Sequence, residues 1–307
     1  MKASRTAPVP VRYPRAMRLV VGVAASFASC LLACSSDDAA SSPVRDAGGA
    51  TISDGGAGDP GDAAGADPGH DASVHGGCDG KTYKLCDDFD TAAAGSTPTG
   101  WTILKGYGNT PPPTAVATDE FHSAPSSIKT SSDVSGASRI LRALSGIGAT
   151  AGTHWGRVFF KVRSPAPQLT KQGPHATFVA LEGNLRAGEL RVVDTQQATS
   201  GKIQLLANTP DDQCCTGTDF SYTIWDGAWH CSEWYVDHVT QSYRYFLDGA
   251  EVTKLAFNYG AGSTKANMPA AFTGVALGSI FYTPMLPSPL VTWFDDLAID
   301  DAQIGCQ

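Results

Sequence analysis

Side chains that can exchange protons or hold an anion occur inside segments with the alternation of β-strands. Alternation places His175 with Thr177 on one face of its segment, and Glu189 with Arg191 on one face of another. The apolar residues that alternation adds to these two faces are Val179 and Val193. Such mixed faces are unusual for a fully buried sheet. His is a common general acid or base near neutral pH, and Arg binds carboxylates, so this pattern indicates a surface that can do chemistry.

Other catalytic signatures are absent from the sequence. It contains no G-x-S-x-G nucleophile elbow, no H-E-x-x-H zinc motif, no P-loop and no dinucleotide-binding fingerprint. A glycosidase with paired carboxylates needs two acids held across the bond that it breaks, but Glu182, Glu189 and Glu233 are isolated in the sequence. Hydrolysis by that route is therefore not indicated.

The segments that carry these residues are short, apolar or alternating, and separated by clusters of Gly, Pro, Asn and Asp. They lie at 155–162, 175–181, 189–193, 202–206, 242–247, 276–277 and 291–299. Strands at regular spacing with turn residues between them are typical of all-β domains. We expect residues 78–307 to form a two-sheet antiparallel β-sandwich of the jelly-roll type.

The N-terminus has the features of an export signal, which we place at residues 1–33. A basic start without acidic residues precedes the run from Leu19 to Ala33, which is apolar or small throughout. That run is too short for a permanent membrane-spanning helix. The basic leader is long, and Met17 offers an alternative start with a compact basic region.

Residues 31–34, Leu-Leu-Ala-Cys, resemble a bacterial lipobox, in which the cysteine after the cleavage site is acylated. Acyl chains on Cys34 would anchor the protein to a membrane through lipid alone. The following Ser35 resembles an outer-membrane sorting signal, so we expect a lipoprotein of the cell envelope. The alternative is a plain secretory signal with a chance cysteine.

A linker without a core follows the signal. Residues 34–77 consist mainly of Ala, Gly, Asp, Ser and Pro, and residues 35–77 hold eight Asp and one Arg. A segment with so little apolar surface cannot fold by itself, and its charges repel one another. We expect a disordered tether.

Six cysteines remain after the signal and the lipobox. They are Cys78, Cys86, Cys214, Cys215, Cys231 and Cys306. An even number in an exported domain indicates three disulfides, with 15 possible connectivities. Because a vicinal bridge is strained, Cys214 and Cys215 more readily bond to separate partners. Zinc is the rival interpretation, but the sequence has no C-x-x-C pair.

The net charge of the chain limits the classes of partner that it can bind. The net charge is −8, and residues 78–307 hold 16 Lys and Arg against 22 Asp and Glu. This balance argues against nucleic acid as a partner. We expect a monomer.

Three groups of motifs together resemble the concanavalin A-like jelly rolls. They are Asp87-Asp-Phe-Asp90 with residues 121–129; Trp229-His-Cys-Ser-Glu-Trp234 with Tyr245-Phe-Leu-Asp-Gly249; and Trp293-Phe-Asp-Asp-Leu-Ala-Ile299. Within that superfamily the sequence is most similar to the polysaccharide-lyase-like group, which includes cellulose-induced fungal proteins and glucuronan lyases. The resemblance covers about residues 85–307 and implies that the first and last strands lie side by side.

The resemblance also implies a calcium site, because in these folds a calcium ion often bridges the first and last strands. Calcium prefers six to eight oxygen ligands. The residues that would supply them are Asp88 or Asp90, Ser123, and Asp295 or Asp296. Since neighbouring residues of a strand face opposite ways, we expect only one of Asp295 and Asp296 to point at the ion. The alternative is solvated aspartates at strand ends.

The lyase-like group further implies a β-elimination site on the concave sheet. Such a site must neutralise a uronate carboxylate, remove the adjacent proton and protonate the leaving oxygen. The candidates are His175 as base, Arg191 as carboxylate clamp, Gln204 as its helper, and Tyr243 or Tyr245 as acid.

Aromatic side chains offer a binding surface for sugars. The sequence supplies Trp101, Tyr107, Trp155, Trp225, Trp229, Trp234 and Tyr282, of which Trp101, Tyr107 and Trp225 lie near loops and are the better ligand candidates. The leading hypothesis is a surface lipoprotein that binds, and by elimination cleaves, a polysaccharide. The alternatives are a non-catalytic carbohydrate-binding or adhesion module and a structural envelope lipoprotein.

Overall fold

The computed structural model describes residues 77–104, 114–147, 151–168, 174–183, 189–209 and 216–307. All of them belong to one compact unit, Ala63–Gln307. The predicted signal, Cys34, the linker to residue 76, Tyr107, Cys214 and Cys215 lie outside the described residues. No helix in the described segments has the length and apolar character needed to cross a membrane.

The described elements are strands apart from one turn of 3-10 helix, η2 (Thr253–Leu255), which confirms the all-β prediction. The strands are β1 (Leu85–Asp87), β2 (Trp101–Leu104), β3 (Ala115–Ala117), β4 (Ser127–Ala143), β5 (Thr153–Val162), β6 (His175–Glu182), β7 (Glu189–Gln197), β8 (Ile203–Asn208), β9 (Thr216–Gly217), β10 (Trp229–Asp237), β11 (Ser242–Leu247), β12 (Ala250–Glu251), β13 (Phe257–Asn258) and β14 (Gly274–Asp300).

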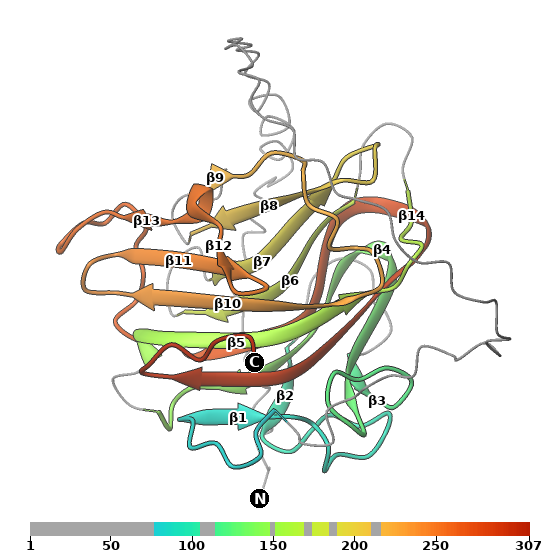
Figure 1. Cartoon of the computed structure of the whole chain (residues 1–307), viewed down its shortest axis with the longest axis horizontal. Coiled ribbons are helices and arrows are strands. Elements are labelled where there is room, and N and C mark those ends of the chain that lie inside the picture. The colour runs from blue at the N-terminus through green and yellow to red at the C-terminus, as the bar shows by residue number, and fades with distance from the viewer. Residues whose placement is uncertain (1–76, 105–113, 148–150, 169–173, 184–188, 210–215) are drawn as a thin grey trace, which may run out of the picture. The chain divides into compact units, whose positions relative to one another are not determined.

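The strands form one continuous antiparallel sheet, with the path β12-β11-β10-β5-β14-β6-β7-β8-β9. The long strands β4 and β14 pair along most of their length. The first part of β14 also pairs with β6, and its last part pairs with β5. Figure 1 shows β14 as the long red strand that curves from one part of the sheet into the other. The two sheets of the predicted sandwich are the two layers of this sheet, which β4 and β14 join.

We call β2, the C-terminal half of β4, the first part of β14 and β6–β9 layer 1. Layer 2 comprises β1, β3, the first half of β4, the last part of β14, β5 and β10–β13. The inner faces of both layers contribute to one apolar core, which includes Phe178 of β6 and Trp234 of β10. The hydroxyl of Tyr243 in β11 donates to the carbonyl of Val192 in β7 at 3.3 Å, so the two layers meet across this core.

The core also explains a glycine in a central strand. Gly156 pairs in register with Trp234, and a Cβ atom on it would lie 2.1 Å from the Trp234 ring. Any larger residue would displace that indole, which is completely buried and whose Nε1 donates to Nε2 of His154 at 3.2 Å. Close approach of ring and backbone therefore requires glycine here.

The first and last strands lie side by side, as the resemblance implied. Leu85 of β1 pairs with Ile299 of β14, and Asp87 pairs with Leu297. Phe89, just after β1, and Phe294 of β14 belong to the same core. Both ends of the domain thus close one sandwich.

Two disulfides are formed among the described cysteines, Cys78–Cys86 and Cys231–Cys306. The second joins the chain's C-terminal tail to β10. Glu233, also in β10 and almost fully buried, accepts the backbone N–H groups of Ile304 and Gly305 at 3.0 and 2.7 Å. The isolated glutamate of the sequence thus holds the tail in place.

Candidate functional site

The candidate site lies on the outer face of layer 1, which points away from the core. A β-bulge in β7 shapes it: Val193 pairs with Val179, but the next pair joins Arg191 to Ala180, so Val192 is an extra residue. The bulge turns Asp194 to the same face as Arg191. Val179 and Val193 are buried in the core, so the prediction that they share the faces of His175 and Arg191 was wrong. Strict alternation fails at a bulge.

Asp194 is the centre of the site, and its side chain has no exposed surface. Its Oδ1 atom lies 3.0 Å from Nε2 of His175 and accepts the Thr177 hydroxyl at 2.8 Å. Its Oδ2 atom accepts Nδ2 of Asn208 and lies 3.9 Å from Nη1 of Arg191. Burial works to raise the pKa of this carboxyl, but the charge and hydrogen bond of His175, the charge of Arg191 and the hydrogen bond of Thr177 hold the pKa below its usual value. Asp194 is therefore a buried carboxylate.

The carboxylate fixes the orientation of the His175 ring. An ionised carboxyl accepts a proton but cannot donate one, so the neutral ring carries its proton on Nε2 and keeps a lone pair on Nδ1. The side chain of His175 is 27% exposed, which leaves the ring accessible from solvent. The pair resembles the carboxylate–imidazole arrangement that prepares a histidine to act as a base.

Tyr282, from β14, completes the site. The centroid of its ring lies 4.6 Å from the centroid of the His175 ring. The Cζ atom of Arg191 lies 4.9 Å from the centroid of the Tyr282 ring. Its hydroxyl is 3.3 Å from the Thr177 hydroxyl. The sequence indicated Tyr282 only as an aromatic, because the bend of β14 that turns it toward β6 has no local sequence signal.

The structure places Tyr243 and Tyr245, the predicted acids, elsewhere. Both lie on the inner face of β11 in layer 2 and are completely buried. Burial raises the pKa of both hydroxyls, that of Tyr243 well above its usual value. Their side chains pack in the core rather than beside His175, whereas Arg244 between them faces outward.

Gln204 lies on the outer face, in the same cross-strand row as His175. Gln196 pairs with His175 on one side and with Gln204 on the other, so Gln204 is two strands away. Its Nε2 atom donates to the carbonyl of Thr218 at 2.7 Å. Gln204 thus shares the face with His175 but lies two rows from Asn208, the cross-strand partner of Arg191, because the Asp194–Leu206 row lies between them.

Two arginines extend the polar face toward the far end of β6 and β7. Arg191 donates through Nε to Glu189 at 3.1 Å, and Arg139 of β4 binds Glu182 and Glu189 at 3.0 and 2.9 Å. Burial works to lower the pKa of the Arg191 guanidinium, but Tyr282, Asp194 and Glu189 raise it. The arginine charges are therefore matched by carboxylates on the same face.

The two loop-proximal tryptophans predicted to bind ligand are buried. Trp101 and Trp225 are each 5% exposed and belong to the core. Trp101 donates through Nε1 to Oδ2 of Asp87 at 2.6 Å, which attaches β2 to the start of the domain. Neither ring is exposed enough to stack on a sugar.

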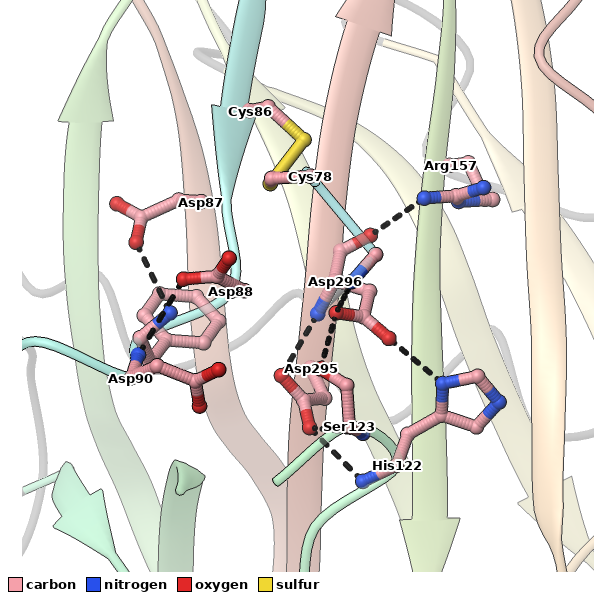
Figure 2. The surroundings of a disulfide bond; sticks show 12 residues. Cys78, Cys86, Asp87, Asp88, Asp90, His122, Ser123, Arg157, Asp295 and Asp296 are labelled. Atoms are coloured by element: carbon pink, nitrogen blue, oxygen red, sulfur yellow. Dashed lines mark hydrogen bonds and ion pairs between the residues drawn. A yellow bond between two sulfur atoms is a disulfide. The ribbon is translucent and has the colours of Figure 1, made fainter. Parts of the chain in front are cut away.

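The predicted calcium ligands lie near one another beside β1 and β14 (Figure 2). Oδ2 of Asp295 accepts the backbone N–H groups of His122 and Ser123 at 2.8 and 3.1 Å. Asp296 accepts the Ser123 hydroxyl at 2.6 Å, and its other oxygen lies 2.6 Å from Nδ1 of His122. Both carboxyls turn to the same loop because Asp296 has a positive φ of 50° next to a bulge, so these neighbouring aspartates do not face opposite ways as strand alternation implied.

The other two predicted calcium ligands, Asp88 and Asp90, directly follow β1 at the same end of the sandwich. Asp90 accepts the backbone N–H of Ser126 at 3.2 Å, and Asp88 accepts the backbone N–H of Asp90 at 3.3 Å. Burial, with the neighbouring charges of Asp88 and Asp296, raises the pKa of Asp90 to about 7. Burial and the adjacent Asp296 also raise the pKa of Asp295 well above its usual value.

These residues do not form a ready calcium cage. The oxygens of Asp295 and Asp296 already accept hydrogen bonds from the loop at 122–123, and the described residues contain no group of three or more His, Cys, Asp or Glu side chains arranged to hold a metal. A cation bound nearby would nevertheless stabilise the ionised form of these closely spaced carboxyl groups. Calcium at this end of the molecule stays a prediction.

No protein-family model and no curated protein matches the chain. Among solved structures it is similar to the cellulose-induced protein Cip1, with a TM-score of 0.46 and 19% identity over 73% of this chain and 100% of that one. It is also similar to a mutant of alginate lyase Aly36B in complex with alginate trisaccharide (0.48, 12%, covering 71% and 98%) and to an endo-β-1,4-glucuronan lyase from the fungus Trichoderma reesei (0.44, 10%, covering 72% and 96%). These are proteins of the group that the sequence motifs resemble. At such TM-scores and identities they carry no argument about activity, which must come from the site itself.

Proposed function

We propose that the chain binds a polysaccharide on the outer face of layer 1 and cleaves it by β-elimination at a uronic acid residue. The observation that carries this proposal is the buried Asp194 carboxylate holding His175, with Tyr282 packed against the imidazole and Arg191 lying over the Tyr282 ring. This arrangement gathers a base, a hydroxyl acid and a cation within about the width of one sugar ring.

Each residue has a separate task in the proposed step. Nδ1 of His175 takes the proton from C5 of the uronate, and the electron pair of that C–H bond becomes the C4–C5 double bond. The C4–O bond breaks, and the Tyr282 hydroxyl protonates the leaving oxygen. Arg191 neutralises the sugar carboxylate, which makes the C5 proton easier to remove. Solvent then takes the proton from His175 and returns one to Tyr282.

The role of Asp194 is to position His175 and to stabilise the imidazolium that forms. Because Asp194 is fully buried and its pKa is lowered, it stays ionised while the histidine gains charge. Thr177 and Asn208 hold the carboxylate in place from either side. A base oriented in this way needs no reorganisation during the reaction.

A specific contact favours the second candidate, a non-catalytic carbohydrate-binding module. Arg191 is already paired with Glu189 and close to Asp194, so a uronate carboxylate must compete with protein carboxylates for the guanidinium. A face that combines aromatic and amide groups can bind sugar hydroxyls without cleaving the chain. The experiment below separates the two functions.

The test is ultraviolet absorbance of the unsaturated uronate product, measured on alginate, glucuronan and pectin. Under the proposal the wild type releases product from at least one polymer, and His175→Ala abolishes the release. Gln196→Ala is the matched control, because Gln196 is the cross-strand neighbour of His175 on the same face but has no role in the proposed step. Binding of a polymer without product, in wild type and variant alike, would establish the binding module instead.

We further propose that the chain is exported and anchored to the cell envelope, in the outer membrane, through acylated Cys34. The two disulfides support an oxidising compartment. Metabolic labelling with palmitate tests the anchor: the wild type takes up the label, and Cys34→Ala does not. Label retained by that variant rejects the anchor, while an unlabelled but secreted wild type indicates the plain secretory signal.

A further inference from the structure

Layer 2 carries an aromatic row on its outer face, opposite to the core. Trp155 of β5 pairs in register with Tyr235 of β10, which pairs with Arg244 of β11. Their sequence neighbours His154, Trp234, Tyr243 and Tyr245 are buried, so alternation turns the row outward. Trp155 and Tyr235 are half-buried and Arg244 is 44% exposed. These three side chains therefore form part of the solvent-facing surface.

The rings of this row are packed into one platform. The ring centroid of Trp155 lies 5.0 Å from that of Tyr235 and 5.6 Å from that of Phe246. The Arg244 guanidinium lies over the Phe246 ring at 4.9 Å and near the Trp155 ring at 5.9 Å. Its position is fixed by a two-point contact with Glu251, at 2.9 and 2.6 Å. The platform is thus held together by contacts within the protein itself.

An open depression of about 470 Å³ adjoins the platform and shares Tyr235 and Arg244 with it. Its other lining residues include the polar Thr240, Ser242 and Asn258 and the aromatic Phe257. Aromatic faces beside hydroxyl and amide groups match a sugar, whose C–H face is apolar and whose edge carries hydroxyls. The depression is large enough for one or two sugar rings on the scale of ordinary ligand pockets.

Charge selects the kind of sugar. The cation of Arg244 is neutralised by Glu251, and Asp237 and Asp300 lie on the register rows around Trp155 and Tyr235. Arg244 is the one cation among the described residues of the platform and the depression lining, and the flanking acids repel a uronate; Lys265 lies outside that lining, over the Tyr259 ring at 4.5 Å. A ligand without charge gains the stacking and hydrogen bonds without that repulsion.

We infer that this platform and depression form a second glycan-binding site that takes a neutral pyranose chain. It lies on the other layer from His175 and does not depend on the proposed elimination. Two sites of different charge preference would let the protein hold a neutral polymer through layer 2 while layer 1 acts on a uronate-containing one.

The test uses the full chain with cellohexaose, mannohexaose and a xyloglucan oligosaccharide, followed by calorimetry and by tryptophan fluorescence. The wild type binds at least one of the three. Trp155→Ala and Tyr235→Ala each weaken that binding about tenfold, as for aromatic anchors of other interfaces. Phe220→Ala, which removes an exposed ring (43%) outside the platform, and His175→Ala leave it unchanged.

Trp155→Phe keeps an aromatic ring and guards against misfolding of the alanine variants. It retains binding within about threefold of wild type, but loses the sugar-induced change in tryptophan emission. The inference is overturned if the wild type binds none of the three probes, or if folded Trp155→Ala and Tyr235→Ala bind as wild type does. Unsaturated product released by Trp155→Ala at the wild-type rate shows that the two sites are separate, and its loss would contradict their independence.

Discussion

Nε2 of His175 lies 3.0 Å from Oδ1 of Asp194, a carboxyl without exposed surface. The partners come from neighbouring strands, β6 and β7, and meet because the bulge at Val192 turns Asp194 outward. Phe178 is likewise an extra residue in β6, so irregularities in both strands assemble the pair, and everything proposed for layer 1 depends on it.

The first prediction separates the tyrosines. Tyr282→Phe should slow elimination about a hundredfold, because it removes the hydroxyl that protonates the leaving oxygen, and should leave the free energy of unfolding nearly unchanged. Tyr243→Phe should do the opposite: it loses the hydrogen bond to Val192 across the core, costs about 1 kcal/mol of stability and keeps the rate. Product formation and urea unfolding of both variants are the measurements. Equal rates for Tyr282→Phe and wild type would remove Tyr282 from the mechanism.

The sequence predicted the all-β class and the meeting of the first and last strands, because turn residues and alternation are local signals. It also predicted that His175 and Arg191 belong to a solvent-facing polar surface. It missed Asp194 since the bulge breaks the period that would have placed it, and it selected Tyr243 and Tyr245 although both share the parity of the core residues of β11. Alternation divides the residues of a strand between two faces, but it does not tell which face the opposite layer of the sandwich covers and buries.

The second prediction concerns the buried carboxylate. Asp194→Ala should cost about 3 kcal/mol, because it leaves His175, Thr177 and Asn208 without their common acceptor. Asp219→Ala is the control: its side chain is 82% exposed, its ion pair is with exposed Lys254, and the change should stay within about 0.5 kcal/mol. Denaturant unfolding at pH 7 measures both. Equal effects would show that Asp194 does not organise the site.

The same residue predicts a pH dependence. The folded pKa of Asp194 lies below its unfolded value, so its stabilising effect is present above the usual pKa of 3.8 and is lost as pH falls through the folded pKa. The stability difference between wild type and Asp194→Asn should therefore be largest near neutral pH and shrink under acid conditions. A difference that grows on acidification contradicts the assigned ionisation.

The disulfides give a prediction based on loop length. Cys231–Cys306 closes a loop with a sequence separation of 75, and Cys78–Cys86 one of only 8. In the chain-entropy treatment, loss of the longer bridge costs about 4.5 kcal/mol and loss of the shorter about 2.5 kcal/mol. Cys306→Ala should thus unfold at lower denaturant concentration than Cys86→Ala. Adding Glu233→Gln to Cys306→Ala should increase the loss of stability further, because the Glu233 carboxylate accepts two N–H groups of the same tail. The reverse order of the two cysteine variants would show that the tail contributes little.

The last prediction uses Asp90, whose pKa is raised by burial and by Asp88 and Asp296 to about 7. A raised folded pKa means that the native state holds the proton more tightly than the unfolded state does, so Asp90 destabilises the fold progressively as pH rises from about 4 to about 7. Asp90→Asn cannot ionise, and its amide oxygen can still accept the Ser126 N–H. Its melting temperature should match that of wild type near pH 4 and exceed it above pH 7. The pair also tests calcium: an ion bound at these acids would raise the melting temperature of wild type at pH 8 and abolish the advantage of Asp90→Asn, and equal curves with and without calcium would reject the ion.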